Sequence, residues 1–330
     1  MTRQRIMSGM RPTGNLHLGN YFGALENWIR LQNEYECFFS IVDWHALTTG
    51  YEDTSEIKNN VMEMAIDWLS AGLDPEKCTI FLQSNVKEIA ELHLLLSMTV
   101  PLSWLERCPT YKDQLVQLKE KNITTYGFLG YPNLQAADIL VHKASVVPVG
   151  EDQLPHLELS REIARRFNYI YGDTFPEPQA KMNQIKQLPG LDGRKMSKSY
   201  NNTIALSDSP DIIREKVMQM ITDPEKIKKN DPGHPDICSV YAFHKVFSEK
   251  THEETYGICK TGGLGCVQCK RGLAENIVEY MAPMYERRQK LLNDKESIVE
   301  ILRAGTKHAR EVAKVTLAEV REKMKLMELE

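Results

Sequence analysis

The chain has 330 residues, of which 42% are hydrophobic and 26% are charged, and its formal net charge is −4. This composition is typical of a water-soluble globular protein long enough for two domains, and it argues against a surface uniformly covered in positive charge for nucleic acid, but not against a local basic face. No apolar run approaches the roughly 18 residues that span a bilayer, and residues 2–5 do not begin a signal peptide. We therefore expect a cytoplasmic protein without membrane contact.

Strands and helices are expected to alternate over the first half of the chain. Short apolar segments predict strands at residues 3–9, 37–42, 79–83 and 146–149. Helices are predicted from near residue 17 and at residues 54–71, 87–98, 111–121, 127–142 and 153–167. This alternation predicts an α/β fold with a doubly wound, Rossmann-type parallel sheet. Ligands of such sheets bind at the carboxyl ends of the strands, which here carry Ser8-Gly9, Asp43-Trp44-His45 and Gln83-Ser84.

The last third of the chain has a different sequence pattern. Proline-rich joints separate helical segments at residues 223–224, 231–232 and 234–235, and no further strand is predicted. A long helix with interleaved Lys and Glu is expected at residues 296–327, as a packed, solvated arm. We therefore expect a catalytic domain at residues 1–205 and an all-helical C-terminal domain at residues 206–330.

The first candidate site is RPTGNLHLGN at residues 11–20, directly after the first predicted strand. Glycines allow the backbone to approach a ligand closely, and the N-terminus of the following helix favours an anion. His17 and Asn20 are three residues apart, so both face one side of the first helical turn. Taken alone, this stretch is explained equally well as a capped, glycine-rich turn.

The second candidate is GRKMSKSY at residues 193–200, which follows a Pro-Gly loop. Lys195 and Lys198 supply cations, and Ser197 and Ser199 supply hydroxyl donors. A mobile loop of this kind is suited to closing over an anionic group. Taken alone, the more ordinary interpretation is a solvated basic surface loop.

A third candidate lies on the predicted helix at 127–142. Tyr131, Gln135 and Asp138 are spaced to line one helix face. A buried carboxylate is costly unless it accepts hydrogen bonds or pairs with a charge, and an indole N–H is a donor only. Asp138 therefore suits recognition of an indole ring, although a lone Asp more often caps or pairs structurally.

Seven cysteines are present, an odd number that favours free thiols and metal ligands over disulfides. Four of them form the pattern Cys238-x20-Cys259-x6-Cys266-x2-Cys269, which indicates a metal site. Zinc is the general choice for four cysteines, but structural zinc sites usually have two Cys-x-x-Cys pairs and this chain has one. Four thiolates also hold a [4Fe–4S] cluster, so both groups stay open on spacing alone.

In combination, Pro-x-x-x-x-His-x-Gly-Asn after a first strand and the later Lys-Met-Ser-Lys-Ser resemble the class I aminoacyl-tRNA synthetases. Asn20 stands where many members have histidine, and it keeps a neutral hydrogen-bond donor. The segments at residues 131–140 and 147–153 are similar to those of tryptophanyl-tRNA synthetases specifically, and the resemblance extends over nearly the whole chain, including residues 105–107 and 160–168. Gln135 stands where many bacterial relatives have methionine.

The resemblance implies a role for each matching position. Asp138 would accept the indole N–H, Gln135 would face the ring plane, and Tyr131 and Gln153 would hold the α-ammonium group. The first segment would contact ATP through Arg11, Pro12, Thr13, Gly19 and Asn20. Gly150, Glu151 and Asp152 would approach the ribose, with Leu188 near adenine. The loop residues closing over the triphosphate would be Lys195, Met196, Ser197, Lys198 and Ser199.

The same resemblance implies activation of L-tryptophan with ATP and Mg²⁺, followed by transfer to tRNA(Trp). Lys195 and Lys198 would stabilise the departing pyrophosphate, with His17 and Asn20 as donors. A homodimer is implied, and a subset of the family carries a structural [4Fe–4S] cluster near the anticodon, which favours iron–sulfur over zinc here. The alternatives are a tyrosyl-specific synthetase, a pantoate-type ligase, and a non-catalytic, metal-dependent RNA-binding relative.

Overall fold

The computed structural model describes residues 3–117, 122–182, 188–327 and 329. At its centre is a five-stranded sheet of order β3-β2-β1-β4-β5, in which every neighbouring pair is parallel. The strands are β1 (Arg5–Met10), β2 (Glu36–Ile41), β3 (Cys78–Leu82), β4 (Val146–Val149) and β5 (Gln179–Met182). The predicted parallel, doubly wound α/β fold is confirmed, with a helical region following it in the chain.

Helices cover both faces of the sheet because successive strand residues point to opposite sides. On β2, Phe39 packs into one core and Phe38 into the other. The first core holds α1 (Leu18–Asn20), α2 (Glu26–Leu31) and α4 (Ile57–Ala71), and the second holds α5 (Lys87–Ser97), α9 (Tyr131–Val141) and α10 (Leu154–Tyr171). Trp28 of α2 stacks on Phe39 with a centroid distance of 4.7 Å. This stacking fixes the helix that follows the first candidate segment.

Several local features differ from the sequence-based expectations. A π-helical turn at Tyr21–Leu25 separates α1 from α2, and an unexpected helix α3 (Asp43–Gly50) follows β2 directly. The helix predicted at 127–142 is divided at Gly130 into α8 (Tyr126–Leu129) and α9. The predicted charged helix is α7 (Pro109–Gln117), which follows α6 (Leu102–Glu106), and residues 118–121 of that prediction lie outside the described residues.

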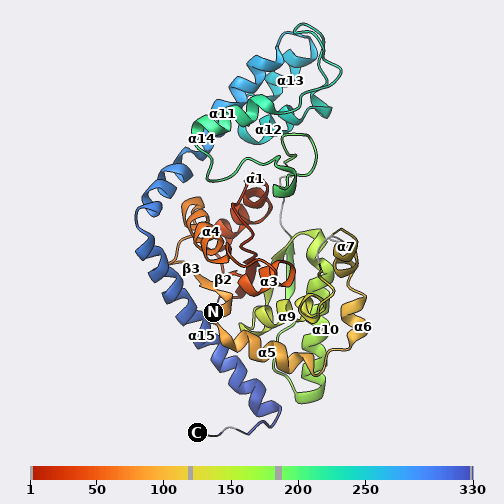
Figure 1. The fold of residues 1–330 in the computed structure, drawn as a ribbon, viewed down its shortest axis with the longest axis vertical. Coiled ribbons are helices and arrows are strands. Elements are labelled where there is room, and N and C mark those ends of the chain that lie inside the picture. The colour runs from red at the N-terminus through yellow and green to blue at the C-terminus, as the bar shows by residue number, and fades with distance from the viewer. Residues whose placement is uncertain (1–2, 118–121, 183–187, 328, 330) are drawn as a thin grey trace.

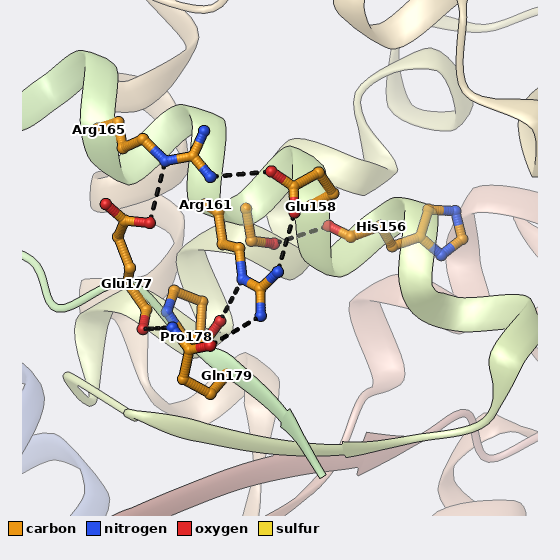
Figure 2. Close-up of polar contacts among 8 residues, drawn as sticks. His156, Glu158, Arg161, Arg165, Glu177, Pro178 and Gln179 are labelled. Carbon is orange, nitrogen blue, oxygen red and sulfur yellow. Dashed lines mark hydrogen bonds and ion pairs between the residues drawn. The ribbon is translucent and has the colours of Figure 1, made fainter. Parts of the chain in front are cut away.

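Strand β5 was not predicted, and arginines of α10 hold the segment that leads into it (Figure 2). Arg161 donates from Nε to the carbonyl oxygen of Pro178 at 2.6 Å and from Nη2 to Gln179 at 3.1 Å. Arg165 bonds Glu177 at 3.0 Å and Glu158 at 2.8 Å. These contacts attach an edge strand that has little apolar content of its own.

The rest of the chain is helical. Its helices are α11 (Pro210–Gln219), α12 (Ser239–Phe247), α13 (His252–Lys260), α14 (Cys266–Leu292) and α15 (Lys295–Lys323). In Figure 1, α11, α12 and α13 gather at one end of an elongated molecule, and α14 runs from them along one side towards the sheet. At about 1.5 Å per residue, α14 is roughly 40 Å long. Among the described residues, no helix has the length and apolarity needed to cross a membrane.

Helix α15 returns to the sheet and packs beside β3 (Figure 1). At Gly305 the two backbones are so close that an added Cβ would lie 1.9 Å from the carbonyl oxygen of Ile80. Thr306 accepts the N–H of Leu82 through its hydroxyl oxygen at 3.3 Å, and His308 stacks on Phe38 at 5.7 Å. The division into residues 1–205 and 206–330 stays a prediction, and α15 lies on the sheet of the first part.

Candidate functional site

The candidate site lies where the sheet reverses its winding. β1 and β4 are neighbours, but the chain leaves β1 towards the first core and leaves β4 towards the second. A crevice at the carboxyl ends of two such strands is the general ligand position in open α/β sheets. The segments that follow these strands are residues 11–20, here called the first signature, and residues 150–153. Both segments contain residues predicted to contact ATP, and Gln153 was predicted to hold the α-ammonium group of tryptophan.

Lys198 connects the first signature with the lysine loop, which we define as residues 189–200. Its Nζ donates to the carbonyl oxygen of Thr13 at 3.2 Å and to that of Gly14 at 2.8 Å. Gly14 has a φ of +103°, a conformation that favours glycine, and Lys198 lies against this turn. The structure thus brings together two predicted segments that are far apart in the sequence.

Backbone pairing also joins the two segments. Leu18 donates its N–H to the carbonyl oxygen of Ile204 at 3.0 Å, and Leu206 donates to that of Leu16 at 2.8 Å. The buried thioether of Met196 receives the N–H of Gly19 at 3.3 Å. An added Cβ at Gly19 would lie 3.0 Å from the His17 ring, so the glycine leaves that ring its space. The first signature therefore contacts the lysine loop at Met196, between its two lysines, and pairs with the residues that follow the loop.

Asn202 organises the lysine loop and was not predicted from the sequence. It is 2% exposed, and its amide donates to Asp192 at 2.7 Å and to the carbonyl oxygen of Lys195 at 3.2 Å. Its amide oxygen accepts the N–H of Ser197 at 2.8 Å. The available signal was the Asn201-Asn202 pair after the loop, since asparagine is favoured at turns and Asn201 has a φ of +49°.

His17 is buried at the start of α1, and the amide oxygen of Asn20 accepts its backbone N–H at 3.1 Å. Burial, together with the nearby charge of Lys198, lowers the pKa of His17 to about 4. The imidazole is therefore neutral at physiological pH. Its Nδ1 is buried and has no hydrogen-bond partner among the described residues. A neutral ring with an unpaired nitrogen suits a hydrogen bond to a phosphate oxygen.

Asp138 is 3% exposed on α9, and two side chains from the ends of neighbouring strands hold its carboxylate. Gln83, after β3, donates its amide to both carboxylate oxygens at 2.8 Å. His45, after β2, lies 3.0 Å from Oδ2 through Nε2. A carboxylate accepts about four hydrogen bonds, so capacity remains on Oδ1 for one further donor. Two of the three strand ends named from the sequence, those after β2 and β3, thus meet at Asp138, a pairing that was not predicted.

Tyr131 and Gln153 are joined by His156, which the sequence analysis did not single out. The Tyr131 hydroxyl lies 2.8 Å from Nε2 of His156, and Nδ1 of His156 lies 3.0 Å from the amide oxygen of Gln153. The imidazole is 3% exposed. Arg11 of the first signature is close enough to Tyr131 for an electrostatic interaction. Tyr131 therefore lies beside the segment that follows β4 and near the first signature.

The remaining predicted positions have simpler surroundings. Leu188 is buried in the first core, Gln135 is half-buried, and Glu151 is exposed after Gly150. Pro12 is buried and Lys195 is exposed. The side chains of Asp152 and Ser199 lie outside the described part of the structure.

The four clustered cysteines lie in or directly before three helices, at the N-terminal end of α14. Cys238 precedes α12, Cys259 lies in α13, and Cys266 and Cys269 lie in the first turn of α14. Burial, and then the charges of the other three cysteines, raise the pKa of Cys269 to about 12, so the thiols are electrostatic neighbours. Within the described ranges, however, no three His, Cys, Asp or Glu side chains are arranged to hold a metal ion.

The parallel sheet, the first signature and the lysine loop together define a class I synthetase catalytic core. The family model described as "tRNA synthetases class I (W and Y)" matches residues 1–282. Within that class, the chain belongs to the tryptophanyl-tRNA synthetase family.

The most similar proteins resemble this chain along its full length. The tryptophan–tRNA ligase of Thermotoga maritima is 51% identical over 98% of this chain and 99% of its own length, and that of Aquifex aeolicus is 46% identical over 98% and 100%. A crystal structure of tryptophanyl-tRNA synthetase from Campylobacter jejuni, complexed with ADP and tryptophan, is 35% identical. It has a TM-score of 0.89 and covers 98% of this chain and 100% of that one.

Proposed function

We propose that this protein is a tryptophan–tRNA ligase that activates L-tryptophan with ATP and transfers it to tRNA(Trp). The observation that carries the proposal is the contact of Lys198 with the carbonyl oxygens of Thr13 and Gly14, which unites the two nucleotide-binding segments at the carboxyl end of β1. Tryptophan–tRNA ligases that are 40–51% identical along nearly the whole chain support the same activity.

In the first step, a tryptophan carboxylate oxygen attacks the α-phosphorus of ATP, and the bond from that phosphorus to the bridging oxygen breaks. Tryptophanyl-adenylate and pyrophosphate are the products. The carboxylate is already ionised, so no general base is required, and the site has to supply alignment and positive charge. Lys195 and Lys198 supply cations from the lysine loop. A Mg²⁺ ion bound together with ATP would neutralise part of the negative charge of the phosphates.

His17 and Asn20 act as neutral donors towards the phosphates. His17 carries no charge at physiological pH because its pKa is lowered to about 4, mainly by burial. Asn20 uses its amide oxygen on the backbone of His17, which leaves its amide hydrogens directed elsewhere. Asparagine at this position therefore keeps both the helix cap and a donor.

In the second step, a hydroxyl of the terminal tRNA ribose attacks the carbonyl carbon of the adenylate. The bond from that carbon to the phosphate oxygen breaks, AMP leaves, and the hydroxyl proton is released. The exposed side chains of Lys260 and Arg271, near the cysteine cluster, are candidate contacts for tRNA phosphates. A tRNA-charging activity also carries the prediction of a cytoplasmic location.

Asp138 gives selectivity for tryptophan. The carboxylate accepts hydrogen bonds and is fixed by Gln83 and His45, so it presents one further acceptor position to an indole N–H. Tyr131 and Gln153, joined through His156, would hold the α-ammonium group. A ring without a donor would leave a buried acceptor unpaired, which is costly.

Pyrophosphate exchange into ATP tests this proposal. Run in parallel with tryptophan, tyrosine, pantoate and no acid, exchange is expected only with tryptophan. Exchange with tyrosine or pantoate would assign one of the two alternative enzymes of the same fold. Absence of exchange with every acid would favour a non-catalytic relative.

We also propose a [4Fe–4S] cluster on Cys238, Cys259, Cys266 and Cys269. Four thiols that influence one another electrostatically support it, and zinc on the same four thiols is the alternative cofactor. When bound, the cluster would link α12, α13 and α14 and order the surface that meets the anticodon. Anaerobically purified protein should be brown, with an absorbance maximum at about 400 nm.

Substitution separates the cluster from incidental iron. Cys266→Ser should lose the colour and the bound iron, whereas Cys108→Ser, which removes a buried thiol of the catalytic part, should keep both. A colourless protein with stoichiometric zinc would contradict the iron–sulfur proposal.

A homodimer is the expected assembly. Large apolar side chains are exposed in the segment 94–102: Leu94 of α5 is 53% exposed, Met98 directly after α5 is 68% exposed, and Leu102 of α6 is 62% exposed. Clusters of exposed apolar side chains favour association. Light scattering should give twice the chain mass of 37.8 kDa, and a single chain mass would contradict a dimer.

A further inference from the structure

Asp67 lies directly beneath the first signature, although it belongs to α4. Its side chain is 1% exposed, and Oδ2 accepts the N–H of Leu16 at 3.2 Å. Leu16 immediately precedes His17. The carboxylate therefore holds the backbone of the ATP-binding segment, at the point where the chain turns into α1.

The second carboxylate oxygen of Asp67 binds Arg288, which comes from the C-terminal part of α14. Nη1 of Arg288 lies 2.6 Å from Oδ1, and Nη2 bonds Glu63, one turn earlier on α4. The guanidinium is 5% exposed, so both ion pairs are shielded from water. Removing one partner from a buried pair leaves an uncompensated charge, which is strongly unfavourable. Asp67 thus depends on Arg288 for its ionised form.

The charged groups facing Asp67 are Arg288 from α14, Glu63 from α4 and Lys198 from the lysine loop. Burial raises the pKa of Asp67 to about 6, and Glu63 adds to the rise. Arg288, the N–H of Leu16 and the charge of Lys198 oppose it. Asp67 therefore changes its charge within a pH range in which the enzyme can be assayed.

We propose that Asp67 and Arg288 are positioning residues for ATP: the pair fixes the backbone of the first signature and so connects α14 to the nucleotide site. The inference rests on the proposed ligase function and assigns residues to it outside the two signatures. Because the first turn of α14 carries Cys266 and Cys269, one continuous helix joins the cysteine region to Arg288, the partner of the aspartate that holds Leu16.

The neighbouring Arg287 separates positioning from simple helix docking. Its Nε donates to the carbonyl oxygen of Ser70 at 2.6 Å, so it attaches α14 to α4 without bonding the Asp67 carboxylate. A merely structural role for Arg288 predicts that Arg287→Gln and Arg288→Gln behave alike. A positioning role predicts that only the change at Arg288 alters nucleotide binding.

The test is pyrophosphate exchange with tryptophan, in which KM is measured separately for ATP and for tryptophan. Arg288→Gln should raise KM for ATP about tenfold, the scale expected when a charge-assisted hydrogen bond is lost, and change KM for tryptophan less than about twofold. Arg287→Gln should leave both constants close to wild type. Arg288→Lys should raise KM for ATP less than Arg288→Gln does, because lysine restores the positive charge but not the two-pronged hydrogen bonding of the guanidinium group.

A pH profile provides an independent readout that does not require a stable Arg288 variant. In the wild type, protonation of Asp67 weakens its hold on Leu16, so KM for ATP should rise as pH falls from 7 to 5.5. Asp67→Asn has no such titration and should start from a raised KM and show a flatter profile.

Three results would overturn the inference. Arg287→Gln and Arg288→Gln could have equal effects, or Arg288→Gln could raise KM for ATP and KM for tryptophan in parallel. The third result is an identical pH profile for wild type and Asp67→Asn. A wild-type protein that shows no tryptophan-dependent exchange would instead overturn the proposed function. The two failures are therefore distinguishable.

Discussion

At the residue scale, Lys198 has the central position, because it belongs to one half of the proposed nucleotide site and its ammonium group contacts the other half. Its partners are the carbonyl oxygens of Thr13 and Gly14, which carry partial charges only. Partial burial lowers the pKa of Lys198, and the charge of Asp67 opposes that shift. An ammonium held by neutral carbonyl groups keeps most of its charge available for a phosphate.

Lys198→Ala should slow tryptophanyl-adenylate formation by about 10²–10³, because it removes a preorganised cation from the position where charge develops on pyrophosphate. Tryptophan binding should stay nearly normal, since Asp138 lies on α9. Single-turnover formation of the adenylate is the measurement. Arg194→Ala is the matched control, because Arg194 pairs with Asp192 in the same loop. An unchanged adenylate rate in Lys198→Ala would refute the role given to this lysine.

His142 makes stability depend on pH. It is completely buried behind Asp138, whose carbonyl oxygen accepts its Nδ1–H at 2.8 Å, and burial lowers its pKa to about 4. In the unfolded chain, histidine has a pKa of about 6.5, so the unfolded state takes up the proton first as pH falls. The contribution of neutral His142 is therefore present above about pH 6.5 and is progressively lost between that pH and about 4.

The expected loss from this group is about 2 kcal/mol of unfolding free energy between pH 7 and pH 5. His142→Gln should show a correspondingly smaller decrease, whatever its stability at pH 7. Urea unfolding at both pH values measures the difference. His252→Gln on α13 is the control and should keep the wild-type decrease, and equal decreases in wild type and His142→Gln would contradict the assignment.

At the element scale, the return of α15 to the sheet depends on a glycine. The added Cβ of Gly305→Ala would overlap the carbonyl oxygen of Ile80, so α15 would have to move away from β3. We expect a loss of at least about 3 kcal/mol in unfolding free energy, measured by urea denaturation. Gly272→Ala in α14 is the matched control, because no atom lies within 4 Å of its added Cβ. It should be stabilised by roughly 0.5–1 kcal/mol.

Similar stabilities for Gly305→Ala and Gly272→Ala would mean that α15 is loosely held. The contact shows how closely a helix predicted as a packed, solvated arm approaches the sheet, and buried side chains of α15 are part of the second core. The periodic pattern and the interleaved charges describe the exposed side of α15. The close approach of α15 to β3, by contrast, depends on the missing side chain of one residue, Gly305.

The sequence predicts those helices and strands whose own hydrophobic pattern is sufficient to identify them. Strands β1 to β4 are short apolar segments, and their parallel orientation follows from the helices between them. β5 escapes prediction because the short segment Gln179–Met182 has little apolar content and is held from outside by Arg161. The site divides in the same way. Motif residues such as His17 and Lys198 are predictable. Asp67, one of two acidic residues in the amphipathic helix α4, belongs to no motif, and its proposed role depends on Arg288.

At the scale of the whole molecule, a continuous apolar core and one long helix join the two ends. Phe22, after the first signature, packs edge-to-face against Phe247 of α12 at 5.6 Å, and Phe247 packs in turn against Tyr280 of α14 at 5.1 Å. The nucleotide site and the helical end therefore share packing. Closure of the lysine loop and occupancy of the helical end by tRNA are expected to influence one another through α14.

The most direct test of the ligase assignment is the charging of tRNA by the purified protein with ATP, using radiolabelled tryptophan or tyrosine in separate reactions. Both chemical steps and the amino-acid choice at Asp138 have to operate for product to form. We expect acid-precipitable tryptophanyl-tRNA and no tyrosyl-tRNA. Charging with tyrosine, or no charging with tryptophan in the presence of tRNA(Trp), would contradict it.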